Sequence, residues 1–496
     1  MLKQKRMSSP QSRKLSAGAL LVAVLFSSGC MVGPNYRRPT APAPPAFKEK
    51  PPDGWKEAQP NDAALKGNWW EIYNDPKLNA LEEQVSISNQ NVLAAEAQYR
   101  AARASVQVAR SALFPTVTAG PSAAVQQGGA TPGLGGKSVF STYEIPFDAS
   151  YQVDLWGSIR RNVRASAETA QATEAQLENA KLSYQADLAQ DYFQLHGIDG
   201  DIALLQSTVD SYTGYLKLTQ ARHDAGIASG ADVAQAQTQL DSAKEQLIDF
   251  GVARTQYEHA VAILVGKAPA ELSIEQQPLQ GQPPQVPVAF PSTLLERRPD
   301  IAISERQMAS LNEQVGIAEA AYYPSLTLSA GAGLASSSFV NLFTWAGRFW
   351  SAGAGLSETL FDAGKRRGQV NIAEAYFDVA MANYRQTVLT AFQQVEDNLS
   401  ALRVLEQETG ATNETVQAAQ TALDITTAQY KAGTATYLQV ETQQTALFAE
   451  QKAIVDLLTR RMVASVLLVE ALGGGWDSSQ LPDVSALSAS DKRAKN

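Results

Sequence analysis

Apolar and polar residues alternate over residues 142–156, TYEIPFDASYQVDLW, where odd positions are apolar and even positions are polar apart from Pro146. Residues 325–334, SLTLSAGAGL, alternate in the same way between an apolar face and a face of serine, threonine and glycine. A period of two predicts β-strands with two different faces. A partner strand is expected beside each, at 116–126 for the first and at 351–361 for the second. The sequence therefore predicts two β-hairpins and four strands.

Between the hairpins the apolar residues follow the helical period. Two rows with heptad-like spacing comprise Phe377, Met381, Tyr384, Val388, Ala391 and Val395, and Ala170, Leu177, Tyr184, Leu188 and Leu195. The core of an ordinary bundle explains such rows locally. However, residues 158–225 lack proline and predict a helix of about 100 Å at 1.5 Å per residue, which Gly197 and Gly200 could interrupt. That length favours a coiled coil. A shorter helix is expected over about 75–113, ending before Pro115.

The chain contains two copies of one unit. Residues 223–240, HDAGIASGADVAQAQTQL, resemble residues 430–447, YKAGTATYLQVETQQTAL. A second pair, 106–120 and 315–331, lies at a similar offset, and all offsets fall between 205 and 209 residues. We therefore expect two copies of helix, β-hairpin, long helix, turn and returning helix.

This duplication predicts the organisation of the whole chain. The expected segments are a signal peptide (1–29), a proline-rich strap (30–65), a first repeat (66–280) with its hairpin at 115–156, a second repeat (281–475) with its hairpin at 324–361, and a C-terminal tail (476–496).

The N-terminus has the pattern of a secretory signal. Basic residues up to Lys14 precede an apolar run over 17–26, and small residues lead to Cys30, the only cysteine. The run into Cys30 resembles a bacterial lipobox, although Ser27 stands where leucine is more usual. Either Cys30 is lipidated or it is a bystander of ordinary signal cleavage, and we expect lipidation. Met31, rather than aspartate, follows Cys30, which resembles the outer-membrane address of such lipoproteins.

The composition predicts an extended segment after Cys30 and argues against two classes of protein, those that bind nucleic acid and those with a membrane-spanning helix. Residues 31–62 hold eight prolines and predict an extended strap that follows the anchor. Charged residues make up only 18 %, and the net charge of −9 argues against nucleic acid as a partner. There is no run of eighteen apolar residues, so no conventional spanning helix is expected.

The predicted strands constrain the assembly. A strand with one apolar and one small polar face suits a boundary between lipid and water. In hydrocarbon every backbone group must be paired, so a spanning sheet must close on itself. Four strands are too few, because known barrels begin at about eight. The barrel must then be shared among several chains.

Four motifs resemble the TolC-like outer-membrane efflux factor family in its lipoprotein branch (OprM/NodT-like). They are Cys30 to Tyr36 with Arg38-Pro39, Trp69-Trp70 with Asp75-Pro76 and Leu78, Leu294 to Ile301 (LLERRPDI), and the paired turns at 223–240 and 430–447. The resemblance implies an α+β membrane protein and a homotrimer whose four strands per chain form a twelve-stranded barrel, continued by a periplasmic α-helical coiled-coil tunnel. It also implies export of small toxic compounds with a periplasmic adaptor and an inner-membrane RND-type pump.

The resemblance also implies candidate gate residues at the helical tips. Asp232 matches a gate aspartate and Tyr430 a gate tyrosine. Ala435 stands where some relatives carry a gate arginine, and Gln439 and Thr442 stand where acidic residues can ring the pore. We therefore expect a gate without a full ionic lock.

The sequence also predicts local roles for glycines and for Asp232 at the tips. Gly226 and Gly433 are expected to end the long helices, and the adaptor is expected to dock at these turns. Asp232 could instead serve as the N-cap of the helix that follows Gly230.

No catalytic or metal-binding set is apparent in the sequence, so we expect no enzyme and no cofactor beyond the lipid on Cys30. His196, His223 and His259 are far apart and are expected to be structural or surface residues. The stretch at 133–138, GLGGKS, approaches a phosphate loop, but Thr131 replaces a required glycine and no helix is expected to follow.

Two alternative functions stay open at this point, together with one question about an aromatic run. The chain could be an outer-membrane duct for type I protein secretion, or a periplasmic coiled-coil lipoprotein without a pore. An aromatic run could form a membrane-interface belt or simply pack its own loop; it comprises Phe339, Phe343, Trp345, Phe349 and Trp350.

Overall fold

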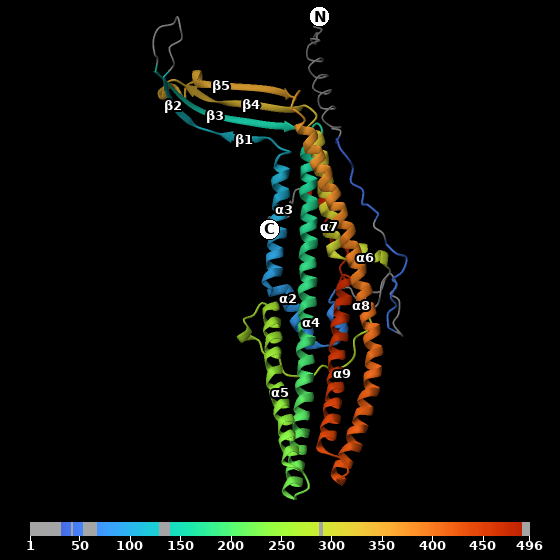
Figure 1. The fold of residues 1–496 in the computed structure, drawn as a ribbon. Helices are drawn as coiled ribbons and strands as arrows, with labels where there is room; N and C mark the ends of the chain where they lie inside the picture. The colour runs from blue at the N-terminus through green and yellow to red at the C-terminus, as the bar shows by residue number, and fades with distance from the viewer. Residues whose placement is uncertain (1–30, 41–42, 53–66, 128–138, 287–290, 489–496) are drawn as a thin grey trace, which may run out of the picture.

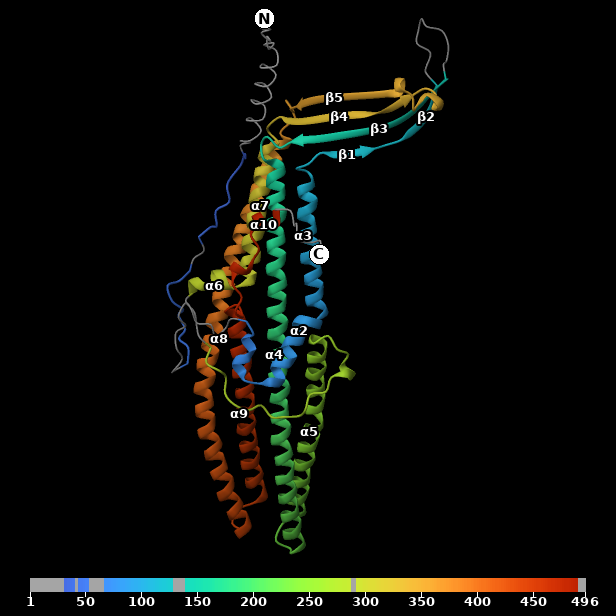
Figure 2. The same cartoon turned by 180° about the vertical axis from the view of Figure 1, so that it is seen from behind.

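A computed structural model describes residues 31–40, 43–52, 67–127, 139–286 and 291–488. A β-sheet lies across one end of an elongated bundle of helices, and two helical hairpins reach the opposite end (Figures 1 and 2). None of the described helices is both long enough and apolar enough to cross a bilayer.

The sheet is antiparallel and built from both predicted hairpins. Its strands are β1 (Thr116–Ala119), β2 (Ser122–Gln127), β3 (Val139–Val153), β4 (Ser325–Ser336) and β5 (Arg348–Ser357). The order is β1-β3-β4-β5, and β2 also pairs with β3. In the described part of the chain, β1 with β2 and β5 are the two outer edges of this sheet.

The partner strand expected over 116–126 is interrupted, so the expectation of one continuous strand there is wrong. β1 and β2 pair with β3 in a single register, as Thr116 opposite Ser150 and Ser122 opposite Glu144 show. Between them, the same register sets Gly120 opposite Pro146 of β3 and Pro121 one position further along, and proline has no N–H to donate to the ladder. Two prolines at neighbouring positions therefore break the edge without shifting the register.

The predicted alternation sorts side chains onto two faces. Ala330 of β4 lies opposite Ala149 of β3 and Ala352 of β5, on the apolar face. Its neighbour Ser329 lies opposite Ser150 and Gly353, on the polar face. The last strand differs from its expected range of 351–361, because it begins at Arg348 and ends at Ser357.

The helices come in pairs of nearly equal length, as a duplication predicts. The long helices have 67 and 68 residues, the returning helices 35 each, and the helices that precede the hairpins 22 each. These pairs are α4 (Ser158–Asp224) and α8 (Lys365–Ala432), α5 (Gly230–Leu264) and α9 (Tyr437–Ala471), and α3 (Gln90–Ser111) and α7 (Pro299–Ala320).

The helix expected over 75–113 is two helices. Asn89 ends α2 (Pro76–Ser88) with a ψ of 121°, and its side chain accepts from the N–H groups of Asn91 and Val92 at the start of α3. One asparagine thus ends one helix and caps the next. The remaining short elements are η2 (Trp69–Tyr73), η3 (Pro269–Glu271), α6 (Pro291–Arg297), η4 (Phe339–Asn341), η5 (Trp345–Gly347), η6 (Ser478–Gln480) and α10 (Val484–Ser488).

The predicted heptad rows lie in the core. Tyr384, Val388, Ala391 and Val395 of α8 are fully buried, as are Leu188 and Leu195 of α4. The strap lies over this bundle without helix or strand in its described part. Its Tyr36 hydroxyl donates to Glu305 at 2.6 Å, and the N–H groups of Lys48 and Glu49 donate to Glu396 at 2.7 and 2.8 Å.

The two glycines that could have interrupted the first long helix leave it unbroken, and both are packing positions. α4 runs unbroken through Gly197 and Gly200. A Cβ on Gly197 would overlap the side chain of Thr459, and one on Gly200 would lie 2.9 Å from Val455 of α9. Glycine here lets α4 and α9 approach closely.

Gly197→Ala should therefore destabilise the protein, although alanine is the better helix former. The overlap with Thr459 should cost about 1–3 kcal/mol in the free energy of unfolding, measured by chemical denaturation in detergent. Gly214→Ala in the same helix is the matched control, since no atom lies within 4 Å of its added Cβ. That control should stabilise by up to about 1 kcal/mol, and equal effects of the two variants would contradict the packing role.

Candidate functional site: the helical tips

The two tip turns have the same backbone geometry. Gly226 follows α4 with a φ of 73°, and Gly433 ends α8 with a φ of 80°. Past each glycine one N–H reaches back five residues, from Ile227 to Arg222 at 2.8 Å and from Thr434 to Gln429 at 2.9 Å. This hydrogen bond, together with a glycine at positive φ, is the common way for a helix to end. The two repeats therefore share the hydrogen bonds of their turns as well as their sequence.

Each returning helix starts with a reciprocal cap. Ser229 caps α5 and accepts from the N–H of Asp232 at 3.2 Å, while the Asp232 carboxylate accepts from the N–H of Ser229 at 3.0 Å. Gln439 at the start of α9 likewise accepts from the N–H of Thr436 at 2.9 Å. Asp232 is therefore the third helical residue of a capping box and not the N-cap itself.

Tyr430 is the predicted site residue that joins the two hairpins. It is 2 % exposed, and its hydroxyl donates to Thr219 of α4 at 3.2 Å. The guanidinium of Arg222 lies 4.6 Å from the centre of the Tyr430 ring and donates to the carbonyl of Lys431 at 3.2 Å. Cation–π stacking and a cation at a helix C-terminus are both favourable. The tyrosine's partners are thus Thr219 and Arg222, which the sequence reading did not single out, and not Asp232.

An apolar cluster, called the tip seam below, fills the space between the hairpins. Its buried members come from three helices and are Ala236, Leu423, Tyr430, Tyr437, Val440 and Leu447. Neutral hydrogen bonds flank it, between the Tyr215 and Thr427 hydroxyls at 2.9 Å and from Gln239 to Thr445 at 3.1 Å. At the tip itself, packing and these neutral polar contacts hold the described parts of the two hairpins together beside the contacts of Arg222. Farther from the tip, Lys452 of α9 lies 3.5 Å from Asp201 of α4.

The other predicted tip residues lie on the surface of the second hairpin. Gln439 and Thr442 are exposed, and the Thr442 hydroxyl donates to Leu438 of its own helix at 2.8 Å. Ala435 is half-buried and packs against the tip seam. The structure thus brings Tyr430 and Ala435 to the seam, and leaves Gln439 and Thr442 on the outer surface of one chain.

The residues after the predicted anchor are tied to the junction of sheet and helices. Cys30 itself lies outside the described residues. The N–H of Val32 donates to the Trp156 carbonyl at 3.0 Å, and the Val32 carbonyl accepts from Arg161 at 2.6 Å. Arg161 is 0 % exposed and pairs with Glu313 at 2.7 Å. The strap therefore starts where β3 ends and α4 begins.

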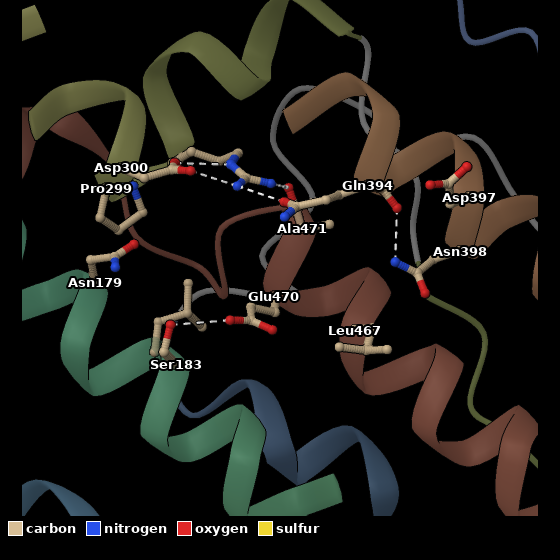
Figure 3. Close-up of a pocket in the computed structure, with 12 residues that line it drawn as sticks. Asn179, Ser183, Pro299, Asp300, Gln394, Asp397, Asn398, Leu467, Glu470 and Ala471 are labelled. Atoms are coloured by element: carbon tan, nitrogen blue, oxygen red, sulfur yellow. Dashed lines mark hydrogen bonds and ion pairs between the residues drawn. The ribbon is translucent and has the colours of Figure 1, made fainter. Parts of the chain in front are cut away.

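The LLERRPDI motif joins the start of α7 and the end of α9 to the middle of α8. Arg298 donates to both oxygens of Asp300, to Gln394 of α8 at 2.8 Å and to the carbonyl of Ala471 at 2.9 Å. These residues line a cavity of about 380 Å³ (Figure 3). Burial raises the pKa of the Glu470 carboxyl in this cavity, where it accepts from the Ser183 hydroxyl at 3.1 Å. These contacts give Arg298 a structural role, because one guanidinium joins Asp300, Gln394 and the Ala471 carbonyl.

The histidines occupy structural or surface positions, as predicted. His196 is buried, and its Nδ1 lies 2.7 Å from the Gln277 carbonyl, so this nitrogen carries the proton. His223 and His259 are exposed. Within the part of the chain that is described, no group of histidine, cysteine and acidic residues is arranged to hold a metal ion. The phosphate-loop-like stretch at 133–138 and Thr131 lie outside the described residues.

The aromatic run lies at the end of the sheet far from the helices (Figure 1). The Phe339 ring packs edge-to-face against Tyr143 at 5.7 Å and against Phe343 at 6.4 Å. Trp345 and Trp350 are largely exposed. The run combines local packing with exposed indoles, so a membrane-interface belt stays a prediction.

Comparison with known proteins places this architecture. The profile of the family described as "Outer membrane efflux protein" matches residues 81–267 and again 290–474, once in each repeat. TtgC of Pseudomonas putida, named a probable efflux pump outer membrane protein, is 29 % identical over 462 residues, which cover 92 % of this chain and 95 % of TtgC. OpmQ of Pseudomonas aeruginosa, named a pyoverdine export outer membrane protein, is 30 % identical over 454 residues, which cover 89 % of this chain and 94 % of OpmQ.

Solved structures agree with the fold. The outer-membrane channel OprN superposes with a TM-score of 0.83 at 29 % identity, over 90 % of this chain and 100 % of OprN. CmeC of Campylobacter jejuni gives 0.84 at 24 % identity, over 92 % and 97 %, which supports the fold alone.

The mixed helix-and-sheet fold, its internal repeat and these matches define an outer-membrane efflux channel component. The chain belongs to the outer membrane efflux protein family. This confirms the resemblance read from its motifs. The family consists of efflux channel proteins rather than enzymes, and its members lie in the outer membrane.

Proposed function

We propose that three copies of this chain close one barrel and one helical tunnel, which together form the exit duct of a tripartite efflux system. The observation that carries the proposal is the sheet: it is four strand positions wide, has one apolar face, and ends in two outer edges. A sheet in hydrocarbon must close. Pairing β5 of one copy with β1 and β2 of the next satisfies both edges, and three copies give twelve strand positions.

A lipid on Cys30 would supply a second attachment to the same membrane. One acyl-cysteine alone holds a membrane modestly, so a lipid anchor and a barrel complement each other. The contacts of Val32 with Trp156 and Arg161 support this arrangement, because they hold the residue two positions after Cys30 beside the end of β3.

The duct is passive, and its gate lies at the tips. Tyr430 holds the second hairpin against the first, while Asp232 and Gln439 stabilise the starts of the returning helices. Gln439 and Thr442 face the surface that a neighbouring copy or the pore would meet. A periplasmic adaptor docks around the Gly226 and Gly433 turns, and an RND-type inner-membrane pump delivers the solute.

The names of relatives favour small toxic compounds as cargo over secreted proteins. One relative is named a toluene efflux pump outer membrane protein and another an antibiotic efflux pump outer membrane protein. A pore-free scaffold would have no use for a sheet with an apolar face and open edges, so we do not carry that alternative further.

Reconstitution tests the duct directly. Protein purified in detergent should have the mass of three chains, and in planar bilayers it should give discrete conductance steps, because a closed barrel passes ions. Mass photometry in detergent and single-channel recording check the two parts. A monomer that stays soluble without detergent would contradict the proposal.

A further inference from the structure

One face of α9 in the tip seam carries buried polar side chains that have no hydrogen-bond partner in the described part of the chain. Tyr437 is 1 % exposed and Gln444 is 4 % exposed. Among the described residues, neither the Tyr437 hydroxyl nor either amide atom of Gln444 has a hydrogen-bond partner. Glu441 lies between them in sequence, and one of its carboxylate oxygens is also buried without a hydrogen-bond partner among the described residues. Unpaired buried polar atoms are rare in native proteins and call for an explanation.

These side chains belong to the seam and not to its margin. Tyr437, Val440, Gln444 and Leu447 follow one another by three, four and three residues, which places them in one row of α9. Val440 and Leu447, on either side of Gln444, are buried members of the tip seam. A polar residue at such a core position lowers the stability of the packed state.

The first hairpin lacks this row. In the alignment of 223–240 with 430–447, Gly230 stands for Tyr437 and Gln237 for Gln444. Gln237 is exposed and donates to Asp241 at 2.8 Å. The unpaired row is therefore a property of the second hairpin and not a general feature of the repeated unit.

The unpaired atoms act on the balance between closed and separated tips. A polar group buried without a partner has lost its bonds to water, and it regains them when water enters. Each such group in the seam therefore favours separation. The hydroxyl of Tyr430 acts in the opposite direction, because its bond to Thr219 exists only in the closed seam. Its ring lies 6.0 Å from that of Tyr437.

We propose that Tyr437 and Gln444 keep the closed tip seam marginally stable, so that these two side chains set how readily the helical tips separate. This inference rests on the proposed function, in which the tips close the duct. Tyr437 and Gln444 are positioning residues, since they act through the packing of the hairpins. Burial raises the pKa of the Tyr437 phenol, so its hydroxyl stays neutral.

Tyr437→Phe tests the inference, because it removes only the unpaired hydroxyl. Backbone amides of residues 437–447 should exchange hydrogen about tenfold more slowly, and spontaneous openings in bilayers should become about tenfold rarer, as the loss of one unpaired buried group implies. Gln444→Leu should act in the same direction. Tyr430→Phe is the matched control, and it should speed exchange and openings several-fold because it removes a paired hydroxyl of the same seam.

The possible outcomes distinguish a failure of this inference from a failure of the proposed duct function. Unchanged or faster exchange in Tyr437→Phe, with wild-type conductance intact, would overturn the inference and leave the duct standing. Slower exchange in both Tyr437→Phe and Tyr430→Phe would also overturn it, because the sign would then not depend on pairing. Absence of conductance from the wild type and every variant would overturn the duct and the inference with it.

Discussion

Replacing Arg161 by methionine should lower the free energy of unfolding by about 3–5 kcal/mol, the cost of removing one partner of a buried ion pair. The guanidinium is fully buried, pairs with Glu313 at 2.7 Å and donates to the Val32 carbonyl at 2.6 Å. Methionine preserves much of the side-chain volume but leaves the Glu313 carboxylate without its partner. Chemical denaturation in detergent, followed by the helical circular dichroism signal, measures the loss.

The same substitution should release the start of the strap. Val32 loses one of its two ties to the helical body, so trypsin should cleave more quickly after Arg37. The double variant Arg161→Met with Glu313→Leu is the control for the charge. It should recover most of the stability, since apolar replacements of a buried pair are often neutral, but it should still expose the strap. An unstable double variant would show that volume, and not the unpaired charge, carries the effect.

Period and repetition in the sequence were sufficient to predict the architecture. Alternation at 142–156 and 325–334 marks the two central strands, and it predicts that Ala149 and Ala330 lie on the apolar faces of their strands, as the observed pairing shows. The duplication predicts helices of matched length. Alternation is a local pattern, and the duplication is found by comparing two parts of the same sequence. Neither pattern requires knowledge of a tertiary contact.

Two features that the sequence did not reveal depend on a neighbour distant in sequence. Gly197 is a breaker by composition, and only Thr459 on α9 makes it a packing position. The interruption of the edge strand becomes visible only in the register, which sets Pro121 one position past the residue opposite Pro146.

At the tips the sequence predicted Tyr430 but not its partners. Family resemblance suggested Asp232 and Tyr430 as separate gate residues and named no partner for either. The structure places the Asp232 carboxylate in a local cap and sets Thr219 and Arg222 beside Tyr430. Helical spacing offered one signal in advance: Arg222 lies in the last turn of a helix, where a cation can serve a helix end. Arg222 binds the end of a different helix, α8, and only the tertiary structure shows this.

Ala330→Arg should prevent the protein from entering the outer membrane. Ala330 lies in the middle of β4 on the apolar face, and it is exposed in the single chain, so no neighbour within the chain excludes a larger side chain. An arginine facing lipid near the midplane of the bilayer costs about 2–4 kcal/mol per chain, and a trimer would carry three. The amount recovered in the outer-membrane fraction measures the effect.

Ser329→Arg is the matched control, one residue away on the polar face. Ser329 is equally exposed in the single chain and lies opposite Ser150 and Gly353. Because this face borders water in a closed barrel, the arginine should be tolerated and only the conductance should change. Equal recovery of both variants would show that the apolar face does not meet lipid. Selective loss of Ser329→Arg would reverse the assignment of the faces, and with it the direction in which the three sheets curve to close.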